Sequence, residues 1–552
     1  MWNSGSTTYR DLLTQYRSQY EAAIAEGTAT PFVYPYESFA ALLLMIYLMI
    51  PREASSLARY LRYPVFGFIT YFFISTMGSC RSPSVATGFA IGLLSAWSIL
   101  WSATLIIFND APRDFKRIER QEKWPAVDGG PNTASNGTAD SAVVSGVQTG
   151  TSGTVAKTYL SKKPSKLSNG SLNHGGGRLV FAHKTGSFSW QSSPKLITER
   201  LDWVSDLVCN FRGMGWNWRI PGLPPPPSWV QEQLQRNDGA KPEKGDSRVG
   251  PNGNVRYQTT KELLWRKFLS FVIGYLVLDI CKVVTMLDPY FWGVFGRPPP
   301  SYLPAFMATS STLLRSYRLI LTLLAIYTAL QTLFFLGSLL FVGLIGPKYI
   351  GARGEPWMYP DTFGSYRNVF DKGLAGWWGG WWHQTFRFAF DSSSKWAVAK
   401  LEWDRKSLKA KILRLFVAFF ASGCLHACGS YTMWPPTQPL RGPFLFFFLQ
   451  TWGIIGQMLA ARALKHYGIT ERTPKLVRQL VNFLYVHVWF YYTAPLLVDD
   501  FARGGVWLFE PVPISPLRGL GFGLKGEGWW RWGGIYLRWH RGRHWWQSGL
   551  AF

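Results

Sequence analysis

Two histidines in apolar surroundings are the first candidates for chemistry in this chain. His426 lies near the middle of a strongly apolar stretch, and His383 lies earlier, in a run rich in tryptophan. An ionisable side chain at membrane depth is costly to keep, so such a residue is a candidate functional site. Desolvation leaves a neutral imidazole that can accept a proton near neutral pH. The sequence therefore predicts a general base that could activate a hydroxyl group.

Each histidine also has a structural interpretation. His426 could form a hydrogen bond between helices and hold a bundle together without chemistry. The small residues before it, Ser422 and Gly423, would permit close approach of either a helix or a substrate. The tryptophans around His383 predict a helix at the membrane interface, with His383 and Arg387 on one face. That helix could be an amphipathic anchor or part of a substrate site.

Long apolar segments must position these side chains. The chain is 47% hydrophobic and 16% aromatic, and several apolar runs reach the ~20 residues that cross a bilayer. We therefore expect an all-α polytopic membrane protein with about eight transmembrane helices enclosing a reaction chamber. The predicted spans are Phe32 to Ile50, Tyr63 to Ser79, Val85 to Phe108, Phe268 to Leu287, Leu319 to Ile345, Ile412 to Trp434, Pro443 to Ala463 and Val477 to Val498.

Composition divides the chain into four regions. Membrane helices 1–3 occupy residues 1–109, a basic insert 110–262, the core 263–510, and a tail rich in Trp and Arg 511–552. The early insert is rich in Gly, Ser, Thr, Asn and Lys and cannot bury enough apolar surface to fold, so we expect it to be largely disordered. Its later part, Leu196 to Trp218, is more apolar and predicts a membrane-surface helix or a cap packed on the core.

The net charge of +26 comes mainly from Lys and Arg in loops and in the insert. We interpret these residues as topology signals and as attraction for lipid head groups or phosphorylated ligands, and we expect no nucleic-acid partner. The positive-inside rule places the insert and the His383 loop in the cytosol and both termini in the lumen, although the tail arginines then lie on the lumenal side. The sequons at Asn136 and Asn169 would remain unmodified.

Other polar residues carry weaker signals. The five cysteines are scattered and imply no disulfide framework. Cys424 and Cys428 share one helical face while His426 points roughly the opposite way, so no metal site is predicted. Asp279 and Lys282 could line a polar cavity or form an intrahelical ion pair.

Together, the two histidine segments resemble the wax-synthase-like branch of the membrane-bound O-acyltransferases. The motifs lie within residues 357–457 and match in order and spacing at Trp378-Gly379, Trp382-His383-Gln384, Ser422-Gly423 and His426. By this resemblance, His426 takes the place of the catalytic histidine, and His383 the place where relatives carry an asparagine or histidine. The resemblance also implies substrate or acyl-CoA contacts for Trp378, Trp382, Gln384, Arg387 and Ser422.

The resemblance implies an O-acyltransferase of the endoplasmic reticulum membrane. Its co-substrate would be acyl-CoA, with acetyl-CoA preferred, and its acceptor a hydrophobic alcohol; no cofactor would be bound permanently. Fungal members often acetylate terpenoid or polyketide-derived alcohols, whereas plant and algal members make wax esters, and the Ser/Gly-rich insert looks like the fungal kind. Two alternatives are a long-chain alcohol O-fatty-acyltransferase and a non-catalytic lipid- or sterol-binding membrane protein.

Overall fold

Helices make up most of the protein in the computed structural model, which describes residues 8–51, 59–121, 186–241, 243, 247–532 and 537–551. The longer helices are α1 (Tyr9–Ala25), α2 (Phe39–Met49), α4 (Arg62–Ser79), α5 (Val85–Ile106), α7 (Ile197–Cys209), α8 (Ser228–Asp238), α9 (Thr260–Leu287), α11 (Ser311–Ser338), α13 (Arg367–Gly376), α14 (Arg387–Lys400), α15 (Leu408–Tyr431), α16 (Leu445–His466) and α18 (Lys475–Arg503). The short ones are α6 (Ala111–Asp114), α10 (Ala305–Thr309), α12 (Pro347–Ile350), α17 (Ile469–Arg472) and α19 (Pro516–Gly519).

The described strands are short and pair in three small sheets. They are β1 (Thr30–Pro31), β2 (Val33–Tyr34), β3 (Cys80–Arg81), β4 (Arg117–Arg120), β5 (Phe188–Gln191), β6 (Arg538–His540) and β7 (Gly549–Ala551). β1 pairs with β3, β4 pairs with β5, and β7 lies between β2 and β6. The sheets therefore join chain segments at the periphery and form no core of their own.

Six of the described helices are long and apolar enough to cross a membrane: α5, α9, α11 with its π-helical extension to Ile345, α15, α16 with the preceding turn from Leu440, and α18. This confirms the all-α polytopic membrane class. The first predicted span, Phe32 to Ile50, contains β2 before α2, and six of the eight predicted spans correspond to helices that meet these criteria of length and composition. The 11 residues of α2 reach only about 16 Å, and α4 begins with Arg62, Tyr63 and Pro64, which lower its mean hydropathy.

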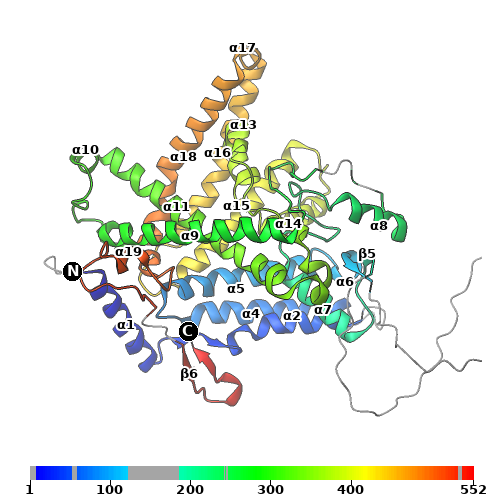
Figure 1. The fold of residues 1–552 in the computed structure, drawn as a ribbon, viewed down its shortest axis with the longest axis horizontal. Helices are drawn as coiled ribbons and strands as arrows, with labels where there is room; N and C mark the ends of the chain where they lie inside the picture. The colour runs from blue at the N-terminus through cyan, green and yellow to red at the C-terminus, as the bar shows by residue number, and fades with distance from the viewer. Residues whose placement is uncertain are drawn as a thin grey trace, which may run out of the picture.

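The two ends of the chain lie at one end of the bundle, and the described part of the insert, with β5, α7 and α8, lies at the other (Figure 1). At the first end, β2 near the N-terminus pairs antiparallel with β7 at the C-terminus. At the other end, Arg120 of the insert pairs with Glu355 in the segment before α13, at 2.6 Å. The described part of the insert therefore contacts the segment that leads to His383, and the shared cytosolic side that the charge pattern indicates stays a prediction.

The described part of the insert is folded. Trp203 on α7 is fully buried and belongs to a core cluster with residues of α2, α5 and α14. Arg117 on β4 forms ion pairs with Asp202 and Asp206 of α7, at 2.6 and 3.2 Å. The segment around α7 is thus a cap packed on the helices. The disorder predicted for the insert 110–262 is therefore not found in its described parts, whereas 122–185, which holds both sequons, lies outside the described residues.

Helix α15, which carries His426, packs at the centre of the bundle against α5, α14 and α16. Its contact with α5 requires a glycine, because a Cβ on Gly92 would lie 1.8 Å from the Cys428 carbonyl oxygen. The Gly92 N–H donates to the Thr432 hydroxyl at 2.9 Å, which fixes the same contact. Ser430, one turn after His426, donates to the buried carboxylate of Asp500 on α18 at 2.6 Å. The position of His426 is therefore set by two neighbouring helices.

Asp279 and Lys282 on α9 form hydrogen bonds with the segment that follows α18. Lys282 Nζ donates to the Trp507 carbonyl at 2.6 Å, and Asp279 accepts hydrogen bonds from the Ser515 hydroxyl and from the Leu517 N–H. Neither the polar cavity nor the intrahelical ion pair that the sequence suggested is formed. Both buried charges instead hold the segment that follows α18 against the bundle.

Candidate active site

The His426 imidazole has a defined orientation on α15. Its Nδ1 lies 2.8 Å from the Ser422 carbonyl oxygen, one turn earlier. A carbonyl only accepts hydrogen bonds, so this contact requires the proton on Nδ1 and leaves the lone pair on Nε2. The side chain is half-buried, so the ring is not sealed by protein atoms. This geometry is suited to proton abstraction by Nε2.

The small residues before His426 serve helix packing. A Cβ on Gly423 would lie 3.0 Å from the Phe444 ring, so glycine lets α15 approach the start of α16 closely. Ser422 is buried, and its backbone carbonyl orients His426. The close neighbour at this point is thus a helix of the same protein.

His383 lies in a break between helices, where the sequence predicted one continuous interfacial helix. A π-helical turn, Trp377–Trp381 (η6), ends at Trp382, whose backbone is extended, and α14 begins only at Arg387. His383 and Arg387 therefore do not share a helical face. Trp377 and Trp381 are buried, so these rings pack inside the protein and do not act as a head-group anchor.

Gln384 and Arg387 stabilise this break. The Gln384 amide donates to the carbonyls of Trp378 and Trp382, both at 2.7 Å, and Arg387 Nη1 donates to Gln384 Oε1 at 2.9 Å and to the Gly379 carbonyl at 3.1 Å. These bonds satisfy carbonyls that the interrupted helix would otherwise leave unpaired. The two side chains hold the conformation in which His383 is presented.

A chain of aromatic contacts connects the two histidines. The His426 ring lies 4.1 Å from the Phe447 ring, and Phe447 lies 5.7 Å from Trp378. Trp378 contacts Trp382 at 6.1 Å, and Trp382 contacts the His383 ring at 5.5 Å. The structure thus brings five of the predicted site residues, His383, His426, Trp378, Trp382 and Gln384, to one aromatic cluster, with Ser422 and Arg387 at its margins.

His383 is held neutral by its surroundings. Burial lowers the pKa of His383 to about 3, and positive charge on His426 and on Arg212 acts in the same direction. His383 Nδ1 is buried and has no hydrogen-bond partner among the described residues. An uncharged ring with an open nitrogen can donate a hydrogen bond to a developing negative charge.

The lowered pKa predicts that acid destabilises the fold. Because the folded pKa of His383 lies below its ordinary value of 6.5, the unfolded chain binds more protons between about pH 3 and pH 6.5. Stability should therefore fall as the pH is lowered from 6.5. We expect the melting temperature of the His383→Gln variant to depend less on pH between 7.5 and 4.5 than that of the wild type. His487→Gln is the control, and equal slopes for all three proteins would contradict the prediction.

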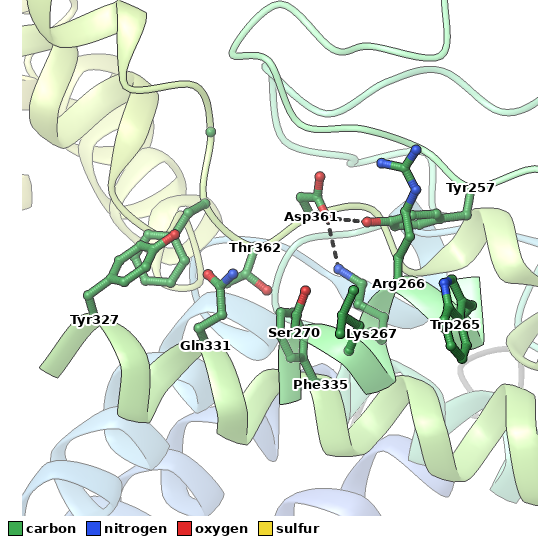
Figure 2. Close-up of a pocket in the computed structure, with 13 residues that line it drawn as sticks. Tyr257, Trp265, Arg266, Lys267, Ser270, Tyr327, Gln331, Phe335, Asp361 and Thr362 are labelled. Atoms are coloured by element: carbon green, nitrogen blue, oxygen red, sulfur yellow. Dashed lines mark hydrogen bonds and ion pairs between the residues drawn. The ribbon is translucent and has the colours of Figure 1, made fainter. Parts of the chain in front are cut away.

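A cavity of about 630 Å³ lies between α9 and α11, beside this cluster. Phe363, in its wall, lies 6.0 Å from the His383 ring. Figure 2 shows Lys267 and Tyr257 both reaching Asp361, at 2.8 and 2.7 Å. The polar and charged residues of the wall are Tyr257, Arg266, Lys267, Ser270, Tyr327, Gln331, Asp361 and Thr362.

Two anchors of this site were not predicted as functional residues. Asp361 accepts the bonds just described, and its own carbonyl accepts from Arg212 at 2.9 Å. Gln450 on α16 is fully buried, and its Oε1 accepts from the indole N–H groups of Trp378 and Trp489, at 3.3 and 3.1 Å. A glutamine in an otherwise apolar run is a sequence signal for Gln450. Asp361 has no comparable signal, because it lies in a loop.

Removal of the Gln450 amide should loosen the aromatic cluster. In Gln450→Leu the two indole N–H groups lose their acceptor, at a cost of about 1–3 kcal/mol for each buried donor. We expect a lower melting temperature and reduced activity, because Trp378 contacts both histidine segments. Gln479→Leu is the matched control, since Gln479 makes one bond at the surface, to Asp371. A Gln450→Leu protein as stable as this control would contradict the assignment.

Comparison with known proteins identifies the region that contains both histidines. Residues 359–449 match the sequence model of the Membrane bound O-acyl transferase family. This region of the chain is similar to that family. The match begins just before the cavity residues Asp361 and Phe363 and ends on α16, so it covers the whole aromatic cluster.

Proteins similar to this chain occur in fungi. The chain is 26% identical over 314 residues to the O-mevalon transferase macI of Penicillium terrestre, which covers 54% of this chain and 61% of the relative. It is 28% identical over 175 residues to the acetyltransferase eriL of Hericium erinaceus, and this match covers 31% of this chain and 42% of the relative. It is 22% identical over 355 residues to the acetyltransferase pyr8 of Aspergillus fumigatus, and this match covers 60% of this chain and 70% of the relative. The chain therefore spans less than two thirds of the first two relatives. No solved structure matches it.

Proposed function

We propose that this protein transfers an acyl group, preferentially acetyl, from acyl-CoA to the hydroxyl of a hydrophobic alcohol within a membrane of the endoplasmic reticulum. The observation that carries the proposal is the His426 imidazole, whose Nδ1–H is bound to Ser422 while Nε2 remains open, inside the region that matches the acyltransferase family. Two of the relatives, eriL and pyr8, are acetyltransferases, which supports acetyl as the acyl group.

The proposed reaction is direct attack. His426 Nε2 accepts the proton of the alcohol as its oxygen attacks the thioester carbonyl carbon, and a His383 N–H donates to the oxygen that becomes negative. The carbon–sulfur bond then breaks, the ester is released, and the CoA thiolate takes the proton from the His426 imidazolium. Protons and bonds balance without a metal or a covalent enzyme intermediate.

The two substrates would approach through different surroundings. The cavity beside Phe363 opens near His383 on the side of the insert, which supports approach of the water-soluble donor there. Lys400 at the end of α14 and Arg405 in the turn before α15 are exposed and would attract CoA phosphates. A mainly apolar cavity of about 680 Å³ borders α15 at Ala427 and Cys428, which supports a hydrophobic acceptor such as a terpenoid alcohol.

The experiment that tests this function uses purified full-length protein in lipid nanodiscs. Radiolabelled acetyl-CoA or palmitoyl-CoA is supplied with hydroxylated terpenoids, polyketide-derived alcohols or long-chain alcohols, and esters are measured. Acetyl esters of a terpenoid or polyketide alcohol are expected. Wax esters alone would select the fatty-acyl alternative. Tight binding of sterol or lipid without ester formation would select a non-catalytic protein.

A further inference from the structure

The end of the chain carries an unusual surface. After Glu527 the sequence has no acidic residue but contains Arg531, Arg538, Arg541 and Arg543. In the described part of this segment, several tryptophans that a folded protein would normally bury are exposed. Their exposed fractions are 59% for Trp530, 69% for Trp539, 83% for Trp545 and 49% for Trp546. We call Trp530, Trp539, Trp545, Trp546, Arg541 and Arg543 the tail surface.

The tail surface is held in place by the rest of the protein. Strand β7 pairs with β2 through Val33 and Ala551 and with β6 through Trp539 and Leu550. Trp530 forms an antiparallel β-bridge with Ile514, in the segment after α18. These contacts come from both ends of the chain, so the exposed tryptophans are presented by a fixed scaffold.

The arginines of the tail divide into two groups. Arg531 pairs with Glu510 and Glu527, at 3.5 and 3.2 Å, and so its charge is neutralised inside the protein. Arg541 and Arg543 are exposed, and neither forms an ion pair with a described residue. No described acidic residue neutralises Arg541 or Arg543, so their positive charges remain available to an external partner.

The tail surface lies beside the ends of candidate membrane helices (Figure 1). It is at the end of the bundle where α5 begins and where α9 and α18 end, next to the N-terminal helix α1 (Figure 1). Exposed tryptophans beside the ends of spanning helices are typical of the membrane–water interface, where the indole is partly apolar and donates a hydrogen bond. Arginine beside them can pair with phosphate.

We propose that the tail surface docks on the head-group layer of an acidic membrane leaflet, with its tryptophans at the interface and with Arg541 and Arg543 bound to lipid phosphates. This interaction accounts for basic residues on the side of the protein where the positive-inside rule expects few. It fixes the termini against the bilayer beside the helix ends. It is independent of the proposed catalytic chemistry.

The depth of the tail surface can be measured by spin labelling in the full-length protein. Cys209, Cys424 and Cys428 are replaced by serine, Cys80 and Cys281 are buried, and a single label is placed at Trp545→Cys. The control label is Glu232→Cys, exposed on α8 at the opposite end of the molecule. In nanodiscs of phosphatidylcholine and phosphatidylglycerol, we expect oxygen to reach the label at 545 better than a water-soluble nickel complex does, with the reverse at 232. Equal access of the nickel complex at both sites would overturn the proposal.

The choice of lipid is tested by a second variant. Arg541→Gln combined with Arg543→Gln should lower the enrichment of phosphatidylglycerol around the protein, measured by native mass spectrometry, by about tenfold or more. Arg236→Gln on α8 is the charge-matched control and should leave it unchanged. Unchanged enrichment in the double variant would overturn the role of these arginines. A water-exposed label at 545 together with binding of RNA or an acidic protein would assign the surface to another class of partner.

Discussion

Replacing His426 with alanine is expected to lower acyl transfer by about 10²–10⁴-fold, the contribution of a positioned general base, while the protein still inserts and folds. The imidazole makes one hydrogen bond, to the backbone of its own helix, so its loss leaves no buried donor of another residue unpaired. The measurement is ester formation by purified variant and wild type at saturating donor.

His487→Ala is the matched control for this prediction. His487 on α18 makes the same type of bond, from Nδ1 to the Phe483 carbonyl at 2.7 Å, but its Nε2 lies 3.1 Å from the Tyr366 hydroxyl. It therefore resembles His426 in local structure and lacks the open nitrogen. Activity close to wild type in His426→Ala, or equal losses in both variants, would rule out the proposed base.

Replacing Asp361 with alanine is expected to give the largest loss of stability. Lys267 Nζ lies 2.8 Å from Asp361, and the exposed fractions of the two side chains are 5% and 31%. Removal of one partner leaves a buried charge unpaired, which costs about 3–5 kcal/mol; the partial exposure of Asp361 places our expectation near 3 kcal/mol. The measurement is thermal unfolding followed by size-exclusion chromatography.

Two further variants make the Asp361 prediction specific. The double variant Lys267→Met, Asp361→Leu removes both charges and should recover much of the lost stability. Asp371→Ala breaks an exposed pair with Arg367, whose side chain is 71% exposed, and should change stability little. An Asp361→Ala protein that melts with the wild type would show that the ion pair does not support the fold.

Hydropathy located the six described helices of membrane length but misplaced several ends. Helix α9 begins at Thr260 and α11 at Ser311, earlier than their apolar runs suggest. The reason is that Lys267 pairs with Asp361 and Arg318 pairs with Asp288. A charged residue that looks like a helix boundary in sequence can lie inside a helix when a distant segment neutralises it, and composition alone carries no information about that partner.

The candidate site was predictable in its residues but not in its conformation. Both histidines were found because imidazoles in apolar sequence are unusual, and the structure places them in one aromatic cluster. The break at Trp382 was missed because helical spacing predicts a continuous helix, whereas Gln384 compensates the interrupted carbonyls. The packing of α7 on the core was only one of two options, because Trp203 is equally suited to a membrane surface and to a protein interior.

If the proposed reaction is correct, a thioester and an alcohol meet at His426 Nε2. The most direct test is an experimental structure of the full-length protein in nanodiscs with a non-hydrolysable acetyl-CoA analogue. We expect the analogue to extend past His383 and to place its carbonyl carbon about 3–4 Å from a position where an alcohol oxygen can also contact His426 Nε2. An analogue bound elsewhere, with no open path from its carbonyl to His426, would rule out the proposed reaction.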